Sequence, residues 1–397
     1  MKKYIFILTA AIMVAMVFNA CPPPPEPDNP GILGDGSEIN PFKVVTVADL
    51  KRVGSNEVGP EGLKWSDDKN YRQIAHIDLS KEPNWKPVGD HQLRFSGVYD
   101  GGGYTISNLT ISNIDKENRG LFGIVFGTVK NVRLDGVIIS GKKDVGCIAG
   151  TLQSHGTIDH CSVKNIDIFC SNYVGGIAGW VSNTSTVNNC IVTEGKVNGT
   201  GTYEGNGWSG GIAGHNAGTI KNCYATVDVS GYQFVGGIAG DNSGNGTILY
   251  CYATGNVFTD FYRAGGIAGE NSGIIKNCVA LNSEVKRKNK HPFYTTPEIG
   301  RITGYVFNDF EMNNNYARFD MALKEGETND DVPLEAEATL TGIHGANVFN
   351  ADCNGANSGT WWKNTAGFSD AQWSFAPNRL PWLNGFNGLT QNPTIIP

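Results

Sequence analysis

Long apolar runs and blocks of like charge are scarce in this sequence. After Phe18, no apolar run approaches the roughly 20 residues that a membrane-spanning helix needs. Only 17% of the residues are charged, the formal net charge is −7, and no block of basic residues offsets it. These absences argue against further membrane spans and against nucleic acid as a partner.

The first 20 residues have the pattern of a signal peptide. Met1-Lys2-Lys3 supplies positive charge, and Tyr4 to Phe18 is almost unbroken apolar sequence. The run ends in Phe18-Asn19-Ala20-Cys21, which resembles a bacterial lipobox. The resemblance implies cleavage before Cys21 and acylation of Cys21; an ordinary signal peptide with a chance cysteine is the alternative. We therefore expect an exported bacterial protein whose membrane partner is reached through a lipid anchor, at the outer membrane or cell surface.

Residues 21–40 are rich in Pro, Gly and acidic residues, which is typical of a semi-rigid extended tether. Beyond this tether, the 52 glycines without a collagen period indicate many tight turns and many short strands. No helical periodicity accompanies them. The composition therefore predicts an all-β body.

One phrase recurs along the middle of the chain, about 26 to 35 residues apart. After Gly120-Leu-Phe-Gly123, the copies are Val145-Gly-Cys-Ile-Ala-Gly150, Val174-Gly-Gly-Ile-Ala-Gly179, Ser209-Gly-Gly-Ile-Ala-Gly214, Val235-Gly-Gly-Ile-Ala-Gly240, Ala264-Gly-Gly-Ile-Ala-Gly269 and the degenerate Ile299-Gly-Arg-Ile-Thr-Gly304. A second phrase of the type Thr219-Ile-Lys-Asn-Cys223 follows most copies. These residues resemble the GLUG repeat of bacterial surface proteins, over about half of the chain.

Each repeat holds three short apolar pieces separated by turn residues, which predicts one coil of a parallel β-helix. We expect a right-handed, three-sided β-solenoid with about 4.8 Å between coils. The predicted boundaries are a signal peptide (1–20), the tether (21–40), an N-terminal cap with the first coils (41–118), the GLUG-repeat β-helix (119–318) and a C-terminal capping segment (319–397).

Two columns of residues follow from this repeat. Ile220 and Cys223 can both face the interior only if the chain bends at Asn222, since strand side chains alternate. Asparagine tolerates the left-handed conformation that such a corner needs. Equivalent corner positions hold Asn131, His160, Asn189, Tyr250, Asn277 and Asn314, and a second asparagine ladder is expected through Asn216, Asn242 and Asn271. Turn asparagines that bond to neighbouring coils are the expected role; a sugar or metal site is the alternative.

The cysteines form a column at one repeat position: Cys161, Cys190, Cys223, Cys251 and Cys278. We expect reduced thiols that fill the core as small apolar groups, although disulfides between coils are geometrically conceivable. No metal site is expected, because a column at coil spacing cannot place four sulfurs around one ion.

Both ends of the solenoid need covering. Thr46-Val-Ala-Asp49 predicts a short amphipathic helix to about Val53, with a capping box between Thr46 and Asp49. The C-terminal segment is rich in aromatic residues, including Trp361, Trp362, Trp373 and Trp382. We expect these residues to close the open core, with a carbohydrate platform as the alternative. The acidic stretch 319–345 is expected to be a loop or an extra strand pair.

The sequence gives little support for chemistry. The seven histidines show no spacing such as His-Glu-x-x-His, and no cofactor or catalytic residue is predicted. Asp241 and Glu270 occupy matching positions one coil apart, in series with His215, and are the candidate carboxylate pair for a glycosidase or lyase. We expect them at a turn, where aligned charges are usually only solvated. A polysaccharide-active enzyme is thus the alternative function.

Binding is the expected function. Loops of variable length and rich in aromatic residues follow the third strand of each repeat, and such insertions project from one edge of a solenoid. The candidate binding edge comprises Tyr203, Trp208, Tyr232, Tyr262, Phe293 and Tyr294. The expected partner is a glycan or an extracellular host or matrix protein, bound by a monomeric surface lipoprotein of adhesin type.

Overall fold

A computed structural model describes residues 34–201, 207–289, 298–307, 310–332, 339, 342–386, 389–391 and 393. The signal peptide, Cys21 and most of the predicted tether lie outside these residues. So do Tyr203, Phe293 and Tyr294 of the predicted binding edge. Among the described residues no helix is both long and apolar enough to cross a membrane.

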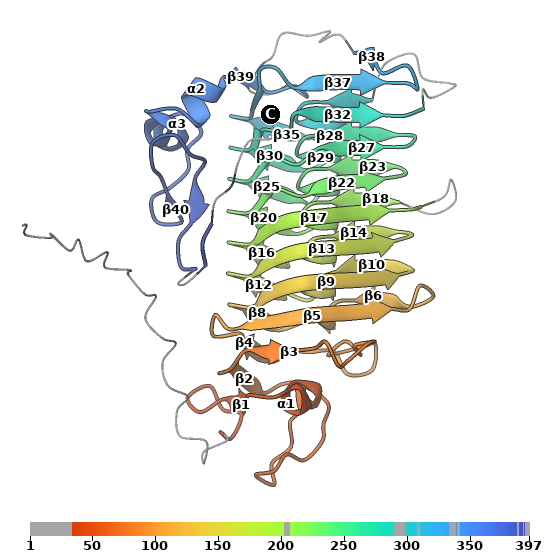
Figure 1. The fold of residues 1–397 in the computed structure, drawn as a ribbon, viewed down its shortest axis with the longest axis vertical. Coiled ribbons are helices and arrows are strands. Elements are labelled where there is room, and N and C mark those ends of the chain that lie inside the picture. The colour runs from red at the N-terminus through yellow and green to blue at the C-terminus, as the bar shows by residue number, and fades with distance from the viewer. Residues whose placement is uncertain are drawn as a thin grey trace, which may run out of the picture.

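The body is the predicted parallel β-solenoid, with coils stacked along the long axis (Figure 1). One side is a ten-stranded sheet in which each strand pairs in parallel with the next coil. Its strands are β1 (Phe42–Val44), β2 (Asn70–Gln73), β4 (Val98–Asp100), β8 (Thr128–Lys130), β12 (Thr157–Asp159), β16 (Thr186–Asn188), β20 (Thr219–Lys221), β25 (Thr247–Leu249), β30 (Ile274–Lys276) and β35 (Glu311–Asn313).

A second side is a fifteen-stranded sheet, in which single long strands give way to two shorter strands per coil. The single strands are β3 (Ile77–Asp78), β5 (Thr105–Ser112), β9 (Arg133–Gly141), β13 (Ser162–Cys170) and β17 (Ile191–Gly199). The later strands are β21 (Tyr224–Ala225), β22 (Asp228–Gly231), β26 (Tyr252–Ala253), β27 (Val257–Thr259), β31 (Val279–Ala280), β32 (Glu284–Arg287), β36 (Tyr316–Arg318), β37 (Ala322–Glu325), β38 (Asp330–Asp331) and β39 (Ala346–Val348).

The third side is divided into two seven-stranded sheets, which we call the edge sheet and the inner sheet. The edge sheet holds β6 (Glu117–Arg119), β10 (Lys143–Gly146), β14 (Tyr173–Gly175), β18 (Trp208–Gly210), β23 (Phe234–Gly236), β28 (Arg263–Gly265) and β33 (Ile299–Gly300). The inner sheet holds β7 (Phe122–Val125), β11 (Ala149–Leu152), β15 (Ala178–Val181), β19 (Ala213–Asn216), β24 (Ala239–Asn242), β29 (Ala268–Asn271) and β34 (Thr303–Val306).

The recurring Gly-Ile-Ala phrase makes the bend between these two sheets. A Cβ atom on Gly210 would lie 2.0 Å from the carbonyl oxygen of Ala213, and one on Gly236 would lie 2.0 Å from that of Ala239. Glycine is therefore required by the close approach of the backbone to itself at the bend. Ile212 and Ile238 are fully buried there and fill the core behind the bend.

The predicted asparagine corners are confirmed. Asn131, His160, Asn189, Asn222, Tyr250, Asn277 and Asn314 all have φ between 50 and 55°. This left-handed residue turns the chain from the ten-stranded to the fifteen-stranded sheet, so that Ile220 and Cys223 are both fully buried. The second ladder is also present: Asn216 Nδ2 donates to Asn242 Oδ1 (2.8 Å), and Asn242 Nδ2 donates to Asn271 Oδ1 (2.7 Å).

The cysteine column is confirmed as a column of free, buried thiols. All eight cysteines that the structure describes are free. In the column, each Sγ donates to the carbonyl two residues earlier, at 3.1–3.4 Å. Burial raises the pKa of the Cys223 thiol well above its usual range. The column therefore packs the core as small apolar groups.

The N-terminal cap is confirmed. Helix α1 (Val47–Arg52) begins after Thr46, whose side chain accepts from the Asp49 amide while the Asp49 carboxylate accepts from the Thr46 amide. Leu50 and Val53 are buried against the first coil. The acidic stretch after residue 319 includes the antiparallel pair β37–β38, one of the two predicted forms.

The prediction that the aromatic C-terminal segment closes the open core is wrong. The segment contains α2 (Asn350–Cys353), α3 (Ser358–Asn364), β40 (Trp373–Ser374) and β41 (Trp382–Leu383), and it lies along the flank of the solenoid (Figure 1). It covers an outward column of the fifteen-stranded sheet that includes Ile191, Tyr224, Tyr252 and Tyr316. Those outward residues are themselves apolar or aromatic, so they offered a second apolar surface. Trp362 and Trp373 are buried in this contact, which is not an open carbohydrate platform.

Candidate functional site

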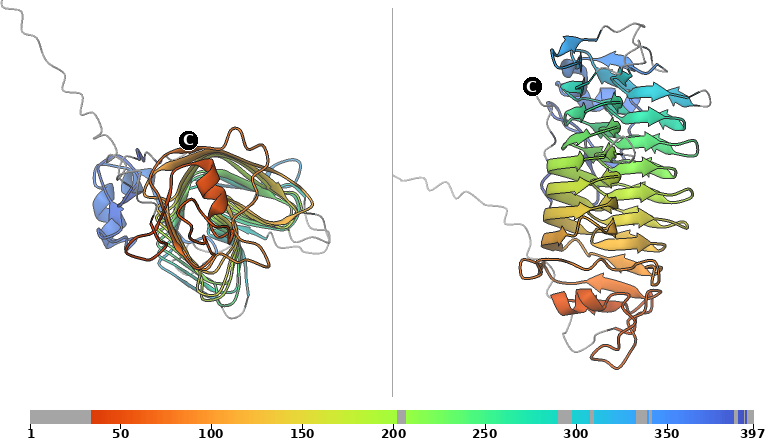
Figure 2. Two further views of the ribbon diagram at one scale, coloured as in Figure 1. Left: turned by 90° about the horizontal axis from the view of Figure 1, so that it is seen from below. Right: turned by 90° about the vertical axis from the view of Figure 1, so that its right-hand side faces the viewer.

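Two rows of outward side chains meet where the edge sheet bends into the inner sheet. In-register pairing aligns Tyr173, Trp208, Phe234 and Arg263 in one row, and the row ends with Asp144 and Glu298, which directly precede the paired residues Val145 and Ile299. It places Thr151, Trp180, His215, Asp241, Glu270 and Tyr305 in the other. We call these twelve residues the seam. The outward side chains of the two sheets contact each other only if the sheets meet at a concave outer angle. Seen along the stack, the coils have a two-lobed outline, which is consistent with such an angle (Figure 2).

Aromatic rings stack along the middle of the seam. The ring centroids of Tyr173 and Trp208 are 4.8 Å apart, and those of Trp208 and Phe234 are 5.3 Å apart with 20° between the planes. His215 reaches across from the inner sheet to within 5.1 Å of the Trp208 ring. Because stacked rings occupy one another's faces, the middle of the stack presents mainly ring edges to a ligand.

The end of the seam at the last coils is held by a network of ion pairs. The guanidinium of Arg263 pairs with Glu270 and, at 3.0 Å, with Glu298. It also lies over the rings of Phe234 (5.3 Å) and Tyr305 (3.9 Å). The Phe307 ring lies 5.5 Å from it as well. One cation thus faces two carboxylates and three aromatic rings, which fixes this end of the stack.

Asp241 and Glu270 are neighbours in register, as predicted, but they lie in strands β24 and β29 and not at a turn. The bend lets β24 and β29 begin directly after the Gly-Ile phrase, so the two carboxylates fall within strands. Asp241 Oδ2 lies 2.8 Å from His215 Nδ1, and Glu270 is paired with Arg263. Each carboxylate therefore has its own basic partner, which is unlike a free two-carboxylate glycosidase site.

At the opposite end of the seam, two buried polar atoms lack hydrogen-bond partners among the described residues. The Lys143 ammonium lies 5.5 Å from the centre of the Tyr173 ring and 5.7 Å from that of Trp180. Asp144 is only 4% exposed, and its Oδ1 has no hydrogen-bond partner among the described residues. The same holds for the buried Nε1 of Trp180. Burial raises the pKa of Asp144 to about 7.

The predicted binding edge borders this seam. Tyr232 stacks on Phe261 at 5.8 Å, and Tyr262 contacts the ring edge of Phe234 at 6.5 Å. Trp208 does not project from the edge with them; it turns into the seam, where its Nε1 donates to Gln233 Oε1 at 3.2 Å. Of the predicted edge residues that the structure describes, Tyr232 and Tyr262 thus lie at the border of the edge sheet, whereas Trp208 belongs to the seam.

Sequence reasoning missed the seam as a unit, although a signal was present. The residue before each phrase of the Val-Gly-Gly type and the residue after each Ala-Gly pair differ in every copy, whereas their neighbours repeat.

A separate sequence feature is Gly207-Trp208-Ser209-Gly210-Gly211, which has the spacing of a nucleophile elbow. However, Ser209 is fully buried within strand β18, so it cannot serve as an exposed nucleophile.

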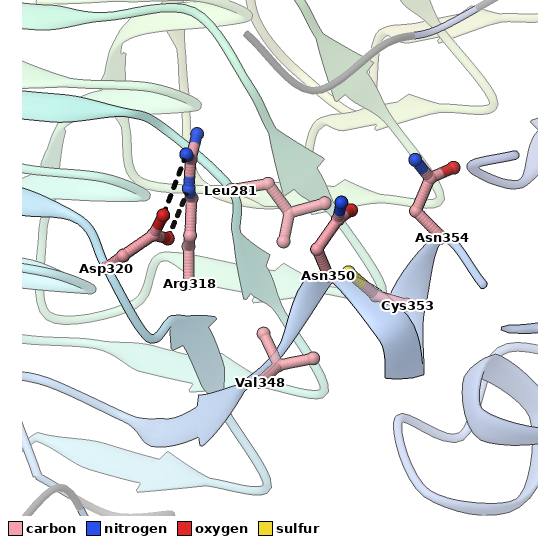
Figure 3. A pocket seen from close by; sticks show the side chains of 7 residues that line it. All are labelled: Leu281, Arg318, Asp320, Val348, Asn350, Cys353 and Asn354. Carbon is pink, nitrogen blue, oxygen red and sulfur yellow. Dashed lines mark hydrogen bonds and ion pairs between the residues drawn. The ribbon is translucent and has the colours of Figure 1, made fainter. Parts of the chain in front are cut away.

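A small cavity of about 250 Å³ lies elsewhere, between the last coils and helix α2 (Figure 3). It is lined by Leu281, Arg318, Asp320, Val348, Asn350, Cys353 and Asn354. Arg318 Nε donates to Asp320 Oδ1 at 2.6 Å, and burial raises the pKa of the Cys353 thiol to about 12. The cavity therefore offers an internally paired charge and an unreactive thiol. In the part of the chain that the structure describes, no three His, Cys, Asp or Glu residues are grouped to hold a metal ion.

Comparison with known proteins supports the repeat and the fold. Residues 205–230 match the model of the GLUG motif. The chain is 34% identical over 136 residues to a protein of Evansella cellulosilytica assigned as a Gly-rich membrane protein, and 33% identical over 138 residues to halomucin of Haloquadratum walsbyi. These matches cover 33% and 32% of this chain, but only 15% and 1% of the two relatives.

A solved structure resembles nearly the whole chain. It is a protein of Bacteroides ovatus assigned as an immunoglobulin A1 protease; the TM-score is 0.55, and the match covers 88% of this chain and 94% of that one. The sequences are 22% identical. At this identity the similarity establishes the shared solenoid fold and not a shared activity.

Proposed function

We propose that this protein is a cell-surface lipoprotein that acts as an adhesin or binding scaffold for a glycan or an extracellular host or matrix protein. We assign the contact surface to the seam and the adjoining edge around Tyr232 and Tyr262. The observation that carries the proposal is the Tyr173–Trp208–Phe234 stack, because it concentrates aromatic area on a surface that does not repeat. Repeating faces of Thr, Asn and Lys discriminate poorly, whereas clustered Trp and Tyr dominate many recognition surfaces.

Replacing Trp208 with alanine tests the contact surface. The soluble body would first be screened against arrayed glycans and matrix proteins. We expect Trp208→Ala to weaken binding of the resulting ligand about 30-fold, the effect of losing a hot-spot contact of about 2 kcal/mol. The matched control is Ile138→Ala, which removes a 58% exposed apolar side chain from the fifteen-stranded sheet. Equal affinity of both variants and the parent would place the binding surface outside the seam.

Lipidation is a separate prediction and rests on Phe18-Asn19-Ala20-Cys21. With Cys21→Ser the acceptor thiol is lost, so the protein should move from the membrane fraction to the soluble fraction. Fractionation without detergent, with metabolic labelling by a fatty acid, measures both effects. A Cys21→Ser protein that stays with the membrane and carries no label would show that another segment anchors it.

A polysaccharide-active enzyme, lyase or glycosidase, is the second candidate. The contact between His215 and Asp241 favours it, since a carboxylate that contacts an imidazole can orient it as a base. Shortening of a polysaccharide by the parent protein, lost in Asp241→Asn, would support this alternative over the binding scaffold.

A further inference from the structure

The end of the seam around Lys143, Asp144 and Trp180 combines buried polar atoms that lack hydrogen-bond partners with a cation that lacks a carboxylate partner among the described residues. Buried atoms of His215, Asp241 and Glu298 also lack hydrogen-bond partners there, but each of these side chains lies within an ion pair. Arg263, at the other end, has two carboxylate partners, whereas Lys143 has no ion-pair partner among the described residues and contacts only ring faces. Below it, Asp144 Oδ1 and Trp180 Nε1 are buried and unpartnered. Buried polar groups are normally satisfied, so such a cluster is the place where a polar ligand gains most.

The chemistry of this cluster selects the ligand. An ammonium group and an indole N–H are donors, and both suit a carboxylate. A hydroxyl group beside that carboxylate can exchange a hydrogen bond with Asp144, while an apolar ring face can pack against the ring edges of Tyr173 or Trp180. A sugar that carries a carboxylate combines these three features in one ring.

We infer that this end of the seam binds the acidic sugar of a glycan, through its carboxylate to Lys143 and Trp180 and a hydroxyl to Asp144. The inference rests on the proposed binding function and names its ligand class. An acidic peptide fits less well, because β10 and β11 each pair on both sides with neighbouring coils. Their backbone groups are thus already used, and an added peptide strand would find no free edge there.

Protonation of Asp144 gives the site a distinctive pH dependence. The charged and titratable groups that act on Asp144 are Lys143 of its own strand, Glu117 of β6 and His215 of β19. The hydroxyl of Thr151 in β11 donates to Asn118 Oδ1. Its pKa of about 7 means that it is mostly neutral below pH 7 and charged above. A bound carboxylate favours the neutral form, so affinity should be highest below pH 7 and fall up to tenfold per pH unit above it.

The test compares acidic oligosaccharides with their own neutral forms. Oligomers of a hexuronic acid and of a sialic acid are titrated calorimetrically into the soluble body, beside the same oligomers with carboxyls reduced to alcohols. We expect at least tenfold tighter binding of an acidic form at pH 6.5, lost in Lys143→Met and kept in Lys142→Met. Lys142 is the matched control, because it is an exposed neighbour outside the ring contact.

Asp144→Asn supplies a readout that a merely structural role would not give. This variant mimics the neutral carboxyl, so it should bind the acidic sugar as well at pH 8 as at pH 6.5. A parent-like fall of affinity with pH in Asp144→Asn, or equal binding of the acidic and reduced sugars, would overturn the inference. Tighter binding of an acidic peptide than of any acidic sugar would also overturn it. If another ligand still depends on Trp208, the proposed binding function stands while this inference fails.

Discussion

Cys223→Asp is expected to prevent the solenoid from folding at pH 7. Cys223 is fully buried, between Cys190 and Cys251 of the neighbouring coils. A carboxylate there would have no cation and no water, and burying an unpaired charge costs several kcal/mol, comparable with the whole stability of a domain. Loss of the β-type circular dichroism spectrum, or a large fall in the midpoint of urea unfolding, measures the effect.

Two comparisons separate charge from packing in this experiment. Cys223→Ala removes only the sulfur and should cost about 1 kcal/mol, as do other small core deletions. For Cys223→Asp, burial would raise the carboxyl pKa in the folded state above its value near 4 in the unfolded chain. The penalty is therefore absent below about pH 4 and grows as the pH rises, so acidification should restore part of the folded signal. A well-folded Cys223→Asp protein at pH 7 would contradict the tightly packed thiol column.

Trp362→Ala is expected to release the C-terminal segment while the solenoid stays folded. Trp362 is fully buried, its Nε1 donates to the Cys353 carbonyl at 2.7 Å, and its ring lies 5.6 Å from that of Tyr252. Truncating a buried tryptophan costs about 3–5 kcal/mol, which is large against the stability of so short a segment. Trypsin should then cut rapidly after Lys363 and Arg379, with little change in the β-type spectrum.

Thr360→Ala is the matched control for this prediction, because Thr360 lies on the exposed side of the same helix α3. Its digestion pattern should equal that of the parent. If Trp362→Ala instead lowers the melting temperature of the whole spectrum without selective cleavage, the segment and the solenoid form one cooperative unit.

The repeat could be predicted because each of its features has a local cause. The left-handed asparagine at position 222, the inward cysteine at 223 and the capping box of Thr46 and Asp49 each depend on a few neighbouring residues. Their repetition in register multiplies a weak local preference into a strong pattern. The parallel ladders then follow from stacking equivalent positions, since every strand needs the next coil to complete its hydrogen bonds.

The seam and the place of the C-terminal segment depend on angles and surfaces that are not local. Tyr173 and His215 are 42 positions apart, and they meet because the bend at the glycine phrase turns two outer faces toward each other. Hydrophobic periodicity reports which side of a strand faces the core, but not whether two outer faces converge. Similarly, an aromatic residue such as Trp373 is predicted to be buried, but its sequence context does not indicate which surface it packs against. In the structure, Tyr224 and Tyr252 provide that surface.

The route of the C-terminal segment has a mechanical consequence. Thr365 accepts a hydrogen bond from Asn314, Phe368 contacts Tyr250, and Phe386 contacts His160. The chain therefore runs back across six coils, in the direction opposite to the order of those coils in the sequence. A stack of parallel coils pulled at its last turn would otherwise peel one coil at a time, each giving way at low force. With the returning segment in place, the last coil can detach only when the aromatic contacts to several coils break at the same time. The pulling force is therefore distributed over those coils.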